Sequence, residues 1–492
     1  MKHTGRIQGF LAAEQGTILA VWAVAFVAIF GIVALSFDLG RVSIVRTELQ
    51  SYADNVALAA AGELDGRADA ITRATAAAAN LISDSETFGN GDTTLSGGGD
   101  YTLTFLEDLP ASDTGAITAT TVDPAKAGYA MVVVNASIID LTFSAAFSAL
   151  TGNPGLDNTA NAYAVAGMTQ YACDVTPLMF CLPTPTPGNP TFKANAHIGE
   201  MIRMRSGGAG AAWGPGDFGF LDPGKILVDD EGPCAGKNGV QLDACLIGAI
   251  GSITQCFAQN GVDTEPGQKV GIEDAIFNVR FDIYKAIMNG KKNNPIYAPA
   301  PNVIKGIVPS GGGSCIGNNE AVSPDTLGLP RDSCFAAGTC SRYGDGNWAA
   351  GRVAYVAMNY AGVDPFPAAN TRWQYYLAEI GAANLIGPNE PILSGLAETG
   401  RAQCSSNQSN NPERRIVIAA AIDCNANPIN GAEVGVPVEE FFKLFLTEPV
   451  GQDGATPPNV DIWAEIVGSA GGSGAGAGAI ASRFRDVVQL YR

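Results

Sequence analysis

The sequence predicts an α+β protein in which a single N-terminal transmembrane helix continues beyond the membrane, followed by a small antiparallel sheet and a large, loop-rich, disulfide-containing α/β region. Three observations predict it: an apolar run near the N-terminus, β-type runs between residues 101 and 167, and ten cysteines confined to the later part of the chain. The expected organisation is a leader (1–16), a transmembrane helix (17–37), an α+β domain (38–171), a Cys/Pro-rich linker (172–191) and a C-terminal domain (192–492).

The apolar run extends from Thr17 to Phe37 and contains neither charge nor proline. A helix of this length reaches about 30 Å, which is the thickness of the hydrocarbon layer of a bilayer. Glu14 lies just before the run and Asp38 just after it, where water is expected to begin. Beyond Asp38 the chain has no second run of this kind, so we expect one membrane anchor and a large soluble part.

The cysteines indicate on which side of the membrane the large part lies. Their even number and the lack of a C-x-x-C pair favour about five disulfides over a zinc site. The sequence does not determine which cysteines pair with one another. The candidates are Cys173, Cys181, Cys234, Cys245, Cys256, Cys315, Cys334, Cys340, Cys404 and Cys424. Lys2 and Arg6 before the anchor suit a cytoplasmic N-terminus, although Arg41 and Arg46 follow it. We therefore expect the bulk of the chain outside the cytoplasm.

The leader carries a pattern similar to that of type IV prepilins. Gly9 and Phe10 follow a short basic stretch, and Glu14 is the fifth residue counted from Phe10. Resemblance to prepilins implies cleavage after Gly9 and a role of Glu14 in subunit packing. Two alternatives stay open, namely a basic anchor flank with Gly-Phe by chance and a removable secretory signal peptide.

After Asp38 the helix is predicted to continue without a break. Apolar residues spaced by three and four form a stripe on one face, made by Val42, Val45, Leu49, Tyr52 and Val56. The stripe is expected to pack on the protein's own sheet or on a neighbouring anchor. Gly62 and Gly66 are expected to end the helix. The following elements are predicted to be helices at 68–82 and 140–152, and strands at 101–106, 116–122, 129–138 and 161–167.

In the C-terminal region the patterns predict further helices and strands between long loops. Helices are expected at 241–257, 272–288, 371–385 and 436–446, and strands at 414–423 and 461–470.

The composition excludes several function classes. A net charge of -19 and the absence of a Lys/Arg cluster argue against nucleic acid as a partner. We find no motif for a cofactor, a metal or a small-molecule substrate. His197 is the only histidine in the outer part, and a lone histidine is usually structural. Paired acids at 229–231 and 439–440 fit solvated surface better than glycoside cleavage.

Residues 14–64 resemble the N-terminal segment of Tad (Flp) pilus-assembly proteins of the TadE/TadG-like group. The shared features are a glycine before the anchor, an acidic-x-Gly-Arg after it and an Ala-rich stretch. The residues that carry them are Gly16, Asp38, Gly40, Arg41, Leu49, Gln50, Ala53, Asp54, Ala57, Leu58, Ala59 and Ala60. Residues 414–424, 436–450 and 462–468 also look like the C-terminal part of TadG-related proteins.

The resemblance implies a TadG-related protein with a pilin-like helix, anchored once in the inner membrane with its N-terminus cytoplasmic and its bulk periplasmic. It implies a non-enzymatic anchor or platform for assembly of an adhesive Tad (Flp) type IVb pilus. The implied partners are other pilus-assembly or pilin subunits and inner-membrane lipid. Metal-dependent adhesion is not implied, because the chain lacks D-x-S-x-S. The alternatives are a minor pseudopilin or pilus-tip adhesin processed after Gly9 and, ranked lower, an anchored periplasmic hydrolase.

Overall fold

The computed structural model describes residues 15–491 except 67, 82, 86, 88–93, 111, 113–114, 125, 153–156, 174, 187–191, 207–212, 223–231, 251–255, 259–260, 266–271, 384–392, 394–397, 453–458 and 473–483. The chain divides into an N-terminal unit, Met1–Met168 with Val487–Arg492, and a C-terminal unit, Thr169–Asp486. The division falls within one strand, so each unit is described by itself.

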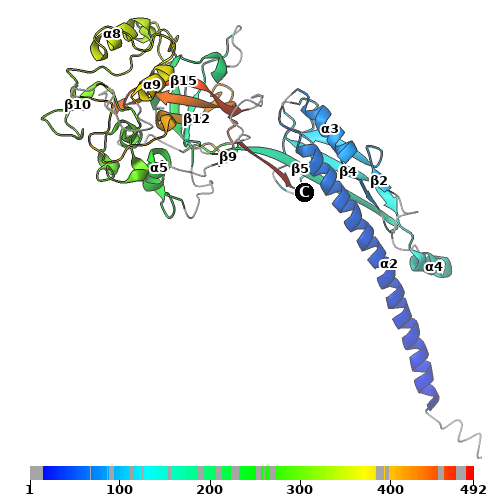
Figure 1. Cartoon of the computed structure of the whole chain (residues 1–492). Coiled ribbons are helices and arrows are strands. Elements are labelled where there is room, and N and C mark those ends of the chain that lie inside the picture. The colour runs from blue at the N-terminus through cyan, green and yellow to red at the C-terminus, as the bar shows by residue number, and fades with distance from the viewer. Residues whose placement is uncertain are drawn as a thin grey trace, which may run out of the picture. The chain divides into compact units, whose positions relative to one another are not determined.

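The N-terminal unit is a long helix packed on an antiparallel sheet (Figure 1). Its helices are α2 (Gln15–Ala61), α3 (Ala70–Leu81) and α4 (Thr142–Thr151). The main sheet has the order β16-β5-β4-β3, formed by β3 (Tyr101–Leu106), β4 (Tyr129–Ile138), β5 (Thr159–Cys173) and β16 (Phe484–Leu490). A separate two-stranded sheet pairs β1 (Ser83–Ser85) with β2 (Thr94–Ser96). The predicted α+β class is confirmed.

The core of this unit lies between α2 and one face of the main sheet. Alternate residues of β4, Ala130, Val132 and Val134, are buried against the helix, as expected of a sheet with one covered face. At Gly167 in β5 an added Cβ would lie 2.5 Å from the Tyr129 ring. Only glycine therefore lets Tyr129 cross the strand and meet Tyr491 edge to face at 5.3 Å.

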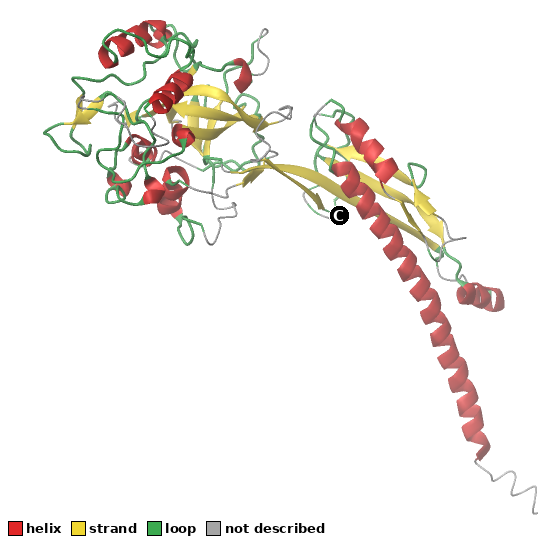
Figure 2. Ribbon diagram, viewed as in Figure 1, coloured by secondary structure: helices red, strands yellow, loops and turns green. Residues whose placement is uncertain are grey.

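The C-terminal unit contains a closed ring of strands among its described residues (Figure 2). The order is β13-β12-β6-β8-β7-β15, with β15 pairing back to β13 and β14 extending from β15. The strands are β6 (Leu178–Cys181), β7 (Met201–Ser206), β8 (Asp217–Phe220), β12 (Ile416–Ile422), β13 (Glu440–Leu446), β14 (Gly451–Gln452) and β15 (Val460–Gly472). The β12–β6 and β7–β8 pairs are parallel, and the other pairs are antiparallel.

One apolar cluster takes side chains from all six strands of the ring. Since alternate residues of a closed sheet face inward, this cluster fills the interior. Phe180, Phe442 and Ile462 belong to it, and residues of α5 (Gly239–Gly248) and α6 (Glu273–Asn278) extend it. The remaining elements are β9 (Cys256–Ala258), β10 (Ile307–Pro309), β11 (Glu320–Val322), α7 (Ser333–Ala336), α8 (Ala349–Asn359) and α9 (Arg372–Ala382).

Several predicted elements differ from the structure. Residues 436–446, predicted as a helix, contain strand β13, and residues 116–122, predicted as a strand, make only an isolated bridge from Thr120 to Leu106. Part of the predicted linker forms β6 in the ring. The helix predicted at 241–257 stops at Gly248, and β9 begins eight residues later at Cys256.

The helix predicted at 272–288 is shorter in the structure, where α6 ends at Asn278, and the conformation of Asp282 explains why. Asp282 has the left-handed backbone conformation, with φ 64°, which a continuing helix does not allow. Its carboxylate accepts hydrogen bonds from the backbone N–H groups of Gln403, Cys404 and Ser405 at 2.6, 2.7 and 2.8 Å. These bonds to a distant loop stabilise the turn that interrupts the helix.

Candidate functional site

The first functional feature is the apolar half of α2. This helix is long and apolar enough to cross a membrane. From Leu19 to Phe37 its large apolar side chains are mostly exposed, and Val27 is 74% exposed. A helix that exposes apolar side chains around its whole circumference needs an apolar surrounding. The predicted span at 17–37 lies within α2, which then continues unbroken to Ala61 as predicted.

The predicted processing residues Gly9, Phe10 and Glu14 lie outside the described residues. Cleavage after Gly9 therefore stays a prediction.

The predicted interaction stripe is buried within the protein itself. Val42 is 9% exposed, and the other four stripe residues are fully buried in the core beneath the sheet. Tyr52 also meets Tyr101 of β3 edge to face at 6.2 Å. Of the two expectations for the stripe, the structure therefore supports packing on the protein's own sheet. Val42 also lines the groove described next, whereas Val45, Leu49, Tyr52 and Val56 lie inside the core.

The opposite face of α2 remains accessible. Ser43, Thr47 and Ser51 repeat every four residues on this face and are exposed. They line a groove of about 810 Å³ that also includes Asp54 and, from β16, Leu490. This groove, which we call the α2 groove, is lined by seven polar or charged residues and by Leu39, Val42, Leu58 and Leu490. Apolar spacing along the helix does not reveal a surface of this mixed kind.

A third feature lies where the apolar half of α2 ends. Asp38 is 1% exposed and accepts a hydrogen bond from the backbone N–H of Ser144, in the first turn of α4, at 2.5 Å. A carboxylate at a helix N-terminus is favoured by the free N–H groups there. One turn further on, Arg41 donates to the carbonyl of Asp140 at 2.9 Å and to the Thr142 hydroxyl at 3.2 Å. The acidic-x-Gly-Arg motif therefore fastens α4 to α2.

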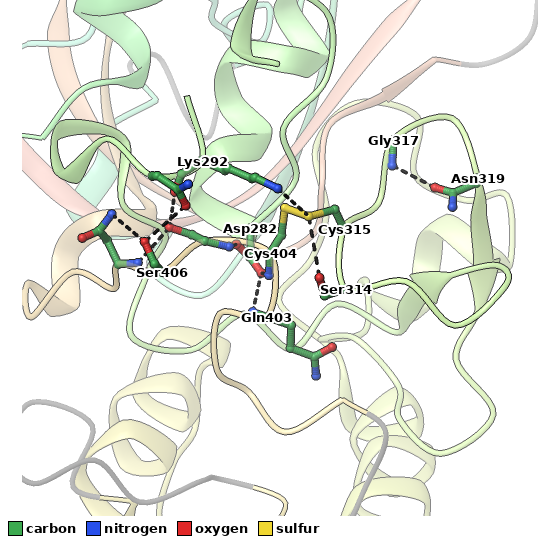
Figure 3. The surroundings of a disulfide bond; sticks show 12 residues. Asp282, Lys292, Ser314, Cys315, Gly317, Asn319, Gln403, Cys404 and Ser406 are labelled. Carbon is green, nitrogen blue, oxygen red and sulfur yellow. Dashed lines mark hydrogen bonds between the residues drawn. A yellow bond between two sulfur atoms is a disulfide. The ribbon is translucent and has the colours of Figure 1, made fainter. Parts of the chain in front are cut away.

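Four disulfides join described residues, all in the C-terminal unit: Cys181–Cys424, Cys234–Cys245, Cys315–Cys404 and Cys334–Cys340. Figure 3 shows the third of these beside Asp282 and Gln403. The backbone register of β5 and β9 places Cys173 opposite Cys256, and the side chains of these two residues lie outside the described part. Disulfides are thus present as predicted.

The C-terminal unit has a charged cleft of about 840 Å³ next to β7 and β15. Arg203 and Arg205 both bind Asp461, at 2.7 Å each. Arg331 lies 3.8 Å from the centre of the Trp463 ring and pairs with Glu448. Burial raises the pKa of Glu448. The cleft residues are thus paired with one another, and we see no nucleophile–base pair among the described ones.

Among the candidate hydrolase residues that the structure describes, His197 and Glu440 both make structural contacts. His197 stacks on Phe192 with ring centres 3.8 Å apart and contacts Glu200 at 3.0 Å. Glu440 lies in β13, where its carboxylate accepts from the backbone N–H of Ala194 at 3.1 Å. Residues 229–231 lie outside the described part. Among the described residues, no group of three His, Cys, Asp or Glu is placed to hold a metal ion.

A buried carboxyl group makes the C-terminal unit sensitive to pH. Glu379 of α9 is 1% exposed and accepts hydrogen bonds from Tyr355, Tyr360 and Asn302 at 2.6, 2.7 and 2.8 Å. Burial raises the pKa of Glu379 to about 7, and these hydrogen bonds offset only part of the rise. The group lies among aromatic side chains and has no place in the cleft, so its role is structural.

This pKa gives a testable pH dependence. The unfolded Glu379 carboxyl titrates near pH 4.5, so between about pH 4.5 and 7 the folded state holds the extra proton. The free energy of unfolding should therefore fall by about 3 kcal/mol as pH rises through this window, and then level off. Urea unfolding followed by tryptophan fluorescence at several pH values measures the slope. Glu379→Gln should reduce it, and an unchanged slope in this variant would contradict the assignment.

Comparison with known protein families gives a match to the residues of α2. Residues 16–63 match the Tad family of Flp pilus-assembly TadE/G-like proteins. The N-terminal segment is TadE/G-like. No curated protein and no solved structure matches the chain.

The TadE/G-like segment covers most of α2, from the start of the apolar half to just beyond Gly62. It includes Asp38, Arg41 and the buried stripe. The resemblance of the N-terminal segment is thereby confirmed. The TadE/G-like segment together with the apolar half of α2 fits a membrane-anchored protein of the pilus-assembly type.

Proposed function

We propose that this protein is a non-enzymatic component of Tad (Flp) pilus assembly, in which the part beyond the membrane acts as an envelope anchor or assembly platform. The observation that carries the proposal is that the TadE/G-like match coincides with α2, which holds both the apolar span and the α2 groove. Within this proposal residues 38–171 are the TadE/G-type domain, 172–191 the link and 192–492 the C-terminal domain.

We further propose that the N-terminus lies in the cytoplasm and the bulk in the periplasm, with α2 in the inner membrane. The disulfides support this orientation, because such bonds persist in an oxidising compartment. The basic residues Lys2 and Arg6 before the span agree with it.

The partners in this proposal are pilin or other pilus-assembly subunits, and they contact the α2 groove. Ten of the eleven residues that line this surface belong to one helix, which suits a second helix running alongside it. We assign the contact to the groove rather than to the stripe because Val45, Leu49, Tyr52 and Val56 are fully buried.

Photo-crosslinking in intact cells tests the proposal. A benzophenone amino acid at Ser43, Thr47 or Ser51 should give adducts that contain pilin or pilus-assembly subunits. The same probe at Val122, which is 92% exposed and lies outside the groove, is the matched control. Adducts of equal yield and identity at Val122, or none from the three groove positions, would contradict the proposal.

The alternative is a minor pseudopilin or tip adhesin built into the fibre. The Gly9–Phe10 sequence before the span favours it. Mass spectrometry of the protein purified from membranes separates the two, because a chain that begins at Phe10 supports the alternative.

A further inference from the structure

Helix α4 lies at the level at which the apolar span ends. The Phe143 ring is 6.4 Å from the ring of Phe37, the last residue of the span. Asp38, the next residue, is bound to the first turn of α4. Phe37 and Asp38 are the residues at which α2 is expected to leave the hydrocarbon layer, and both contact α4. These contacts fix the position of α4 along α2.

The surface of α4 is apolar and uncharged. Its ten residues, TFSAAFSALT, contain no ionisable side chain. Phe143 and Phe147, four residues apart and thus on one face, are 47% and 54% exposed. Phe37 and Ile138, at the end of β4 nearest to α4 in the chain, are 63% and 51% exposed. Phe37, Phe143 and Phe147 thus present exposed aromatic side chains at the exit of α2, where water would otherwise cover them.

We propose that α4 is an interfacial helix that rests on the membrane, with Phe143 and Phe147 inserted at the boundary between headgroups and acyl chains of the leaflet that α2 leaves at Phe37. Helices that lie in this region of a bilayer bury a face of Trp, Phe or Leu side chains at the headgroup–acyl boundary. The occupant of the apolar face is lipid, because the Phe37 contact makes this face continuous with the span. The inference depends on α2 crossing the membrane and goes beyond any role in pilus assembly.

This gives the Asp38–Arg41 motif a positioning role. Asp38 and Arg41 bind opposite sides of the α4 start, the Ser144 N–H and the Asp140 carbonyl. They hold the interfacial helix at a fixed height, so the N-terminal unit has two attachments to the membrane rather than one. Two attachments restrict the tilt of α2 and the distance of the sheet from the lipid.

The test uses the full-length protein, one copy per phosphatidylcholine nanodisc, with a benzophenone amino acid at Phe147. Irradiation is expected to add the mass of one lipid molecule to the peptide that contains position 147. Position 30, in the middle of the span, is the positive control. Val122 is the negative control, because it lies at the end of the sheet away from α4. It is two residues after Thr120, which bridges to Leu106 at the end of β3. Leu106 in turn pairs with Tyr129, at the end of β4 opposite to Ile138.

Each pattern of adducts either supports or overturns the proposal. Lipid adducts at 30 and 147 but not at 122 support the proposal. Adducts at 30 alone, or crosslinks from 147 to protein, overturn the interfacial role while leaving the anchor intact. Absence of lipid adducts at 30 overturns the span itself. The yield at 147 should also be unchanged when phosphatidylglycerol is added, since α4 is uncharged, and a requirement for anionic lipid would overturn apolar insertion.

Discussion

Replacing Arg372 by Met is expected to destabilise the C-terminal unit by about 3–5 kcal/mol, because it leaves two buried carboxylates without their counter-ion. The side chains of Arg372, Asp332 and Glu465 are all 0% exposed. The guanidinium donates to Asp332 at 2.5 Å and to Glu465 at 3.1 Å. It also donates to the carbonyls of Pro330 and Gly199, so the substitution leaves four acceptors short of a donor.

Tryptophan fluorescence during urea unfolding of the full-length protein measures this loss. Of the five tryptophans, only Trp22 lies outside the C-terminal unit, and the Arg372 guanidinium lies 5.2 Å from the Trp348 ring. Arg331→Met is the matched control: the Arg331–Glu448 pair is 47% and 22% exposed, so its loss should cost about 1 kcal/mol or less. Adding Asp332→Asn and Glu465→Gln to Arg372→Met should recover part of the stability. If Arg372→Met costs no more than Arg331→Met, the buried network does not stabilise the unit.

Removing the Cys181–Cys424 disulfide by double substitution to Ala is expected to cost up to about 5 kcal/mol. This bond joins residues 243 positions apart and ties the end of β6 to the residues just after β12. The two strands are parallel neighbours, with Cys181 opposite Ile422. Breaking the bond releases a very long loop in the unfolded chain, and the gain in entropy favours unfolding.

The Cys334–Cys340 bond provides the comparison, because its residues are only six positions apart. By the same loop-entropy relation its removal should cost about 3 kcal/mol less. The midpoints of urea unfolding of the two double variants, measured under identical oxidising conditions, give the difference. Equal losses would show that loop entropy does not determine the stabilisation.

The sequence predicts most reliably those helices and strands whose apolar residues follow a single periodicity, either helical or alternating. The predicted strands at 101–106 and 129–138 match β3 and β4, and the helix at 371–385 contains α9. Helix α9 begins at a capping box formed by Thr371 and Gln374, a signal that is local in sequence. Elements of this kind can be predicted because the signals that define them lie within a few residues of one another.

Strand β13 shows why other elements could not be predicted. All seven of its residues are buried, including Glu440 and Lys443, so it lacks the apolar–polar alternation of a half-exposed strand. The sequence EFFKLFL is equally compatible with a helix. Its pairing with β12 and β15 decides the outcome, and these partners are set by closure of the ring.

The candidate site was predictable only in part. The span and the stripe follow from residue spacing along one helix, but the spacing left open whether the stripe faces the sheet or a partner. The attachment of α4 depends on Asp38 meeting Ser144, 106 residues away. No local pattern signals such a contact, although the position of Asp38 directly after the span marks it as a residue that needs a partner.

In the orientation that we propose, the closed ring has a consequence for the order of events during export. Its first strand in the sequence, β6, starts at Leu178, and its last, β15, begins at Val460 and must pair with both β13 and β7. A chain that crosses the membrane from its anchored end therefore cannot complete this unit until nearly all of it has been translocated. Until β15 arrives, β7 and β13 present unpaired edges. Cys181 can form its disulfide only after Cys424 has emerged. In the proposed orientation the partly translocated chain therefore exposes strand edges of a kind that favours aggregation.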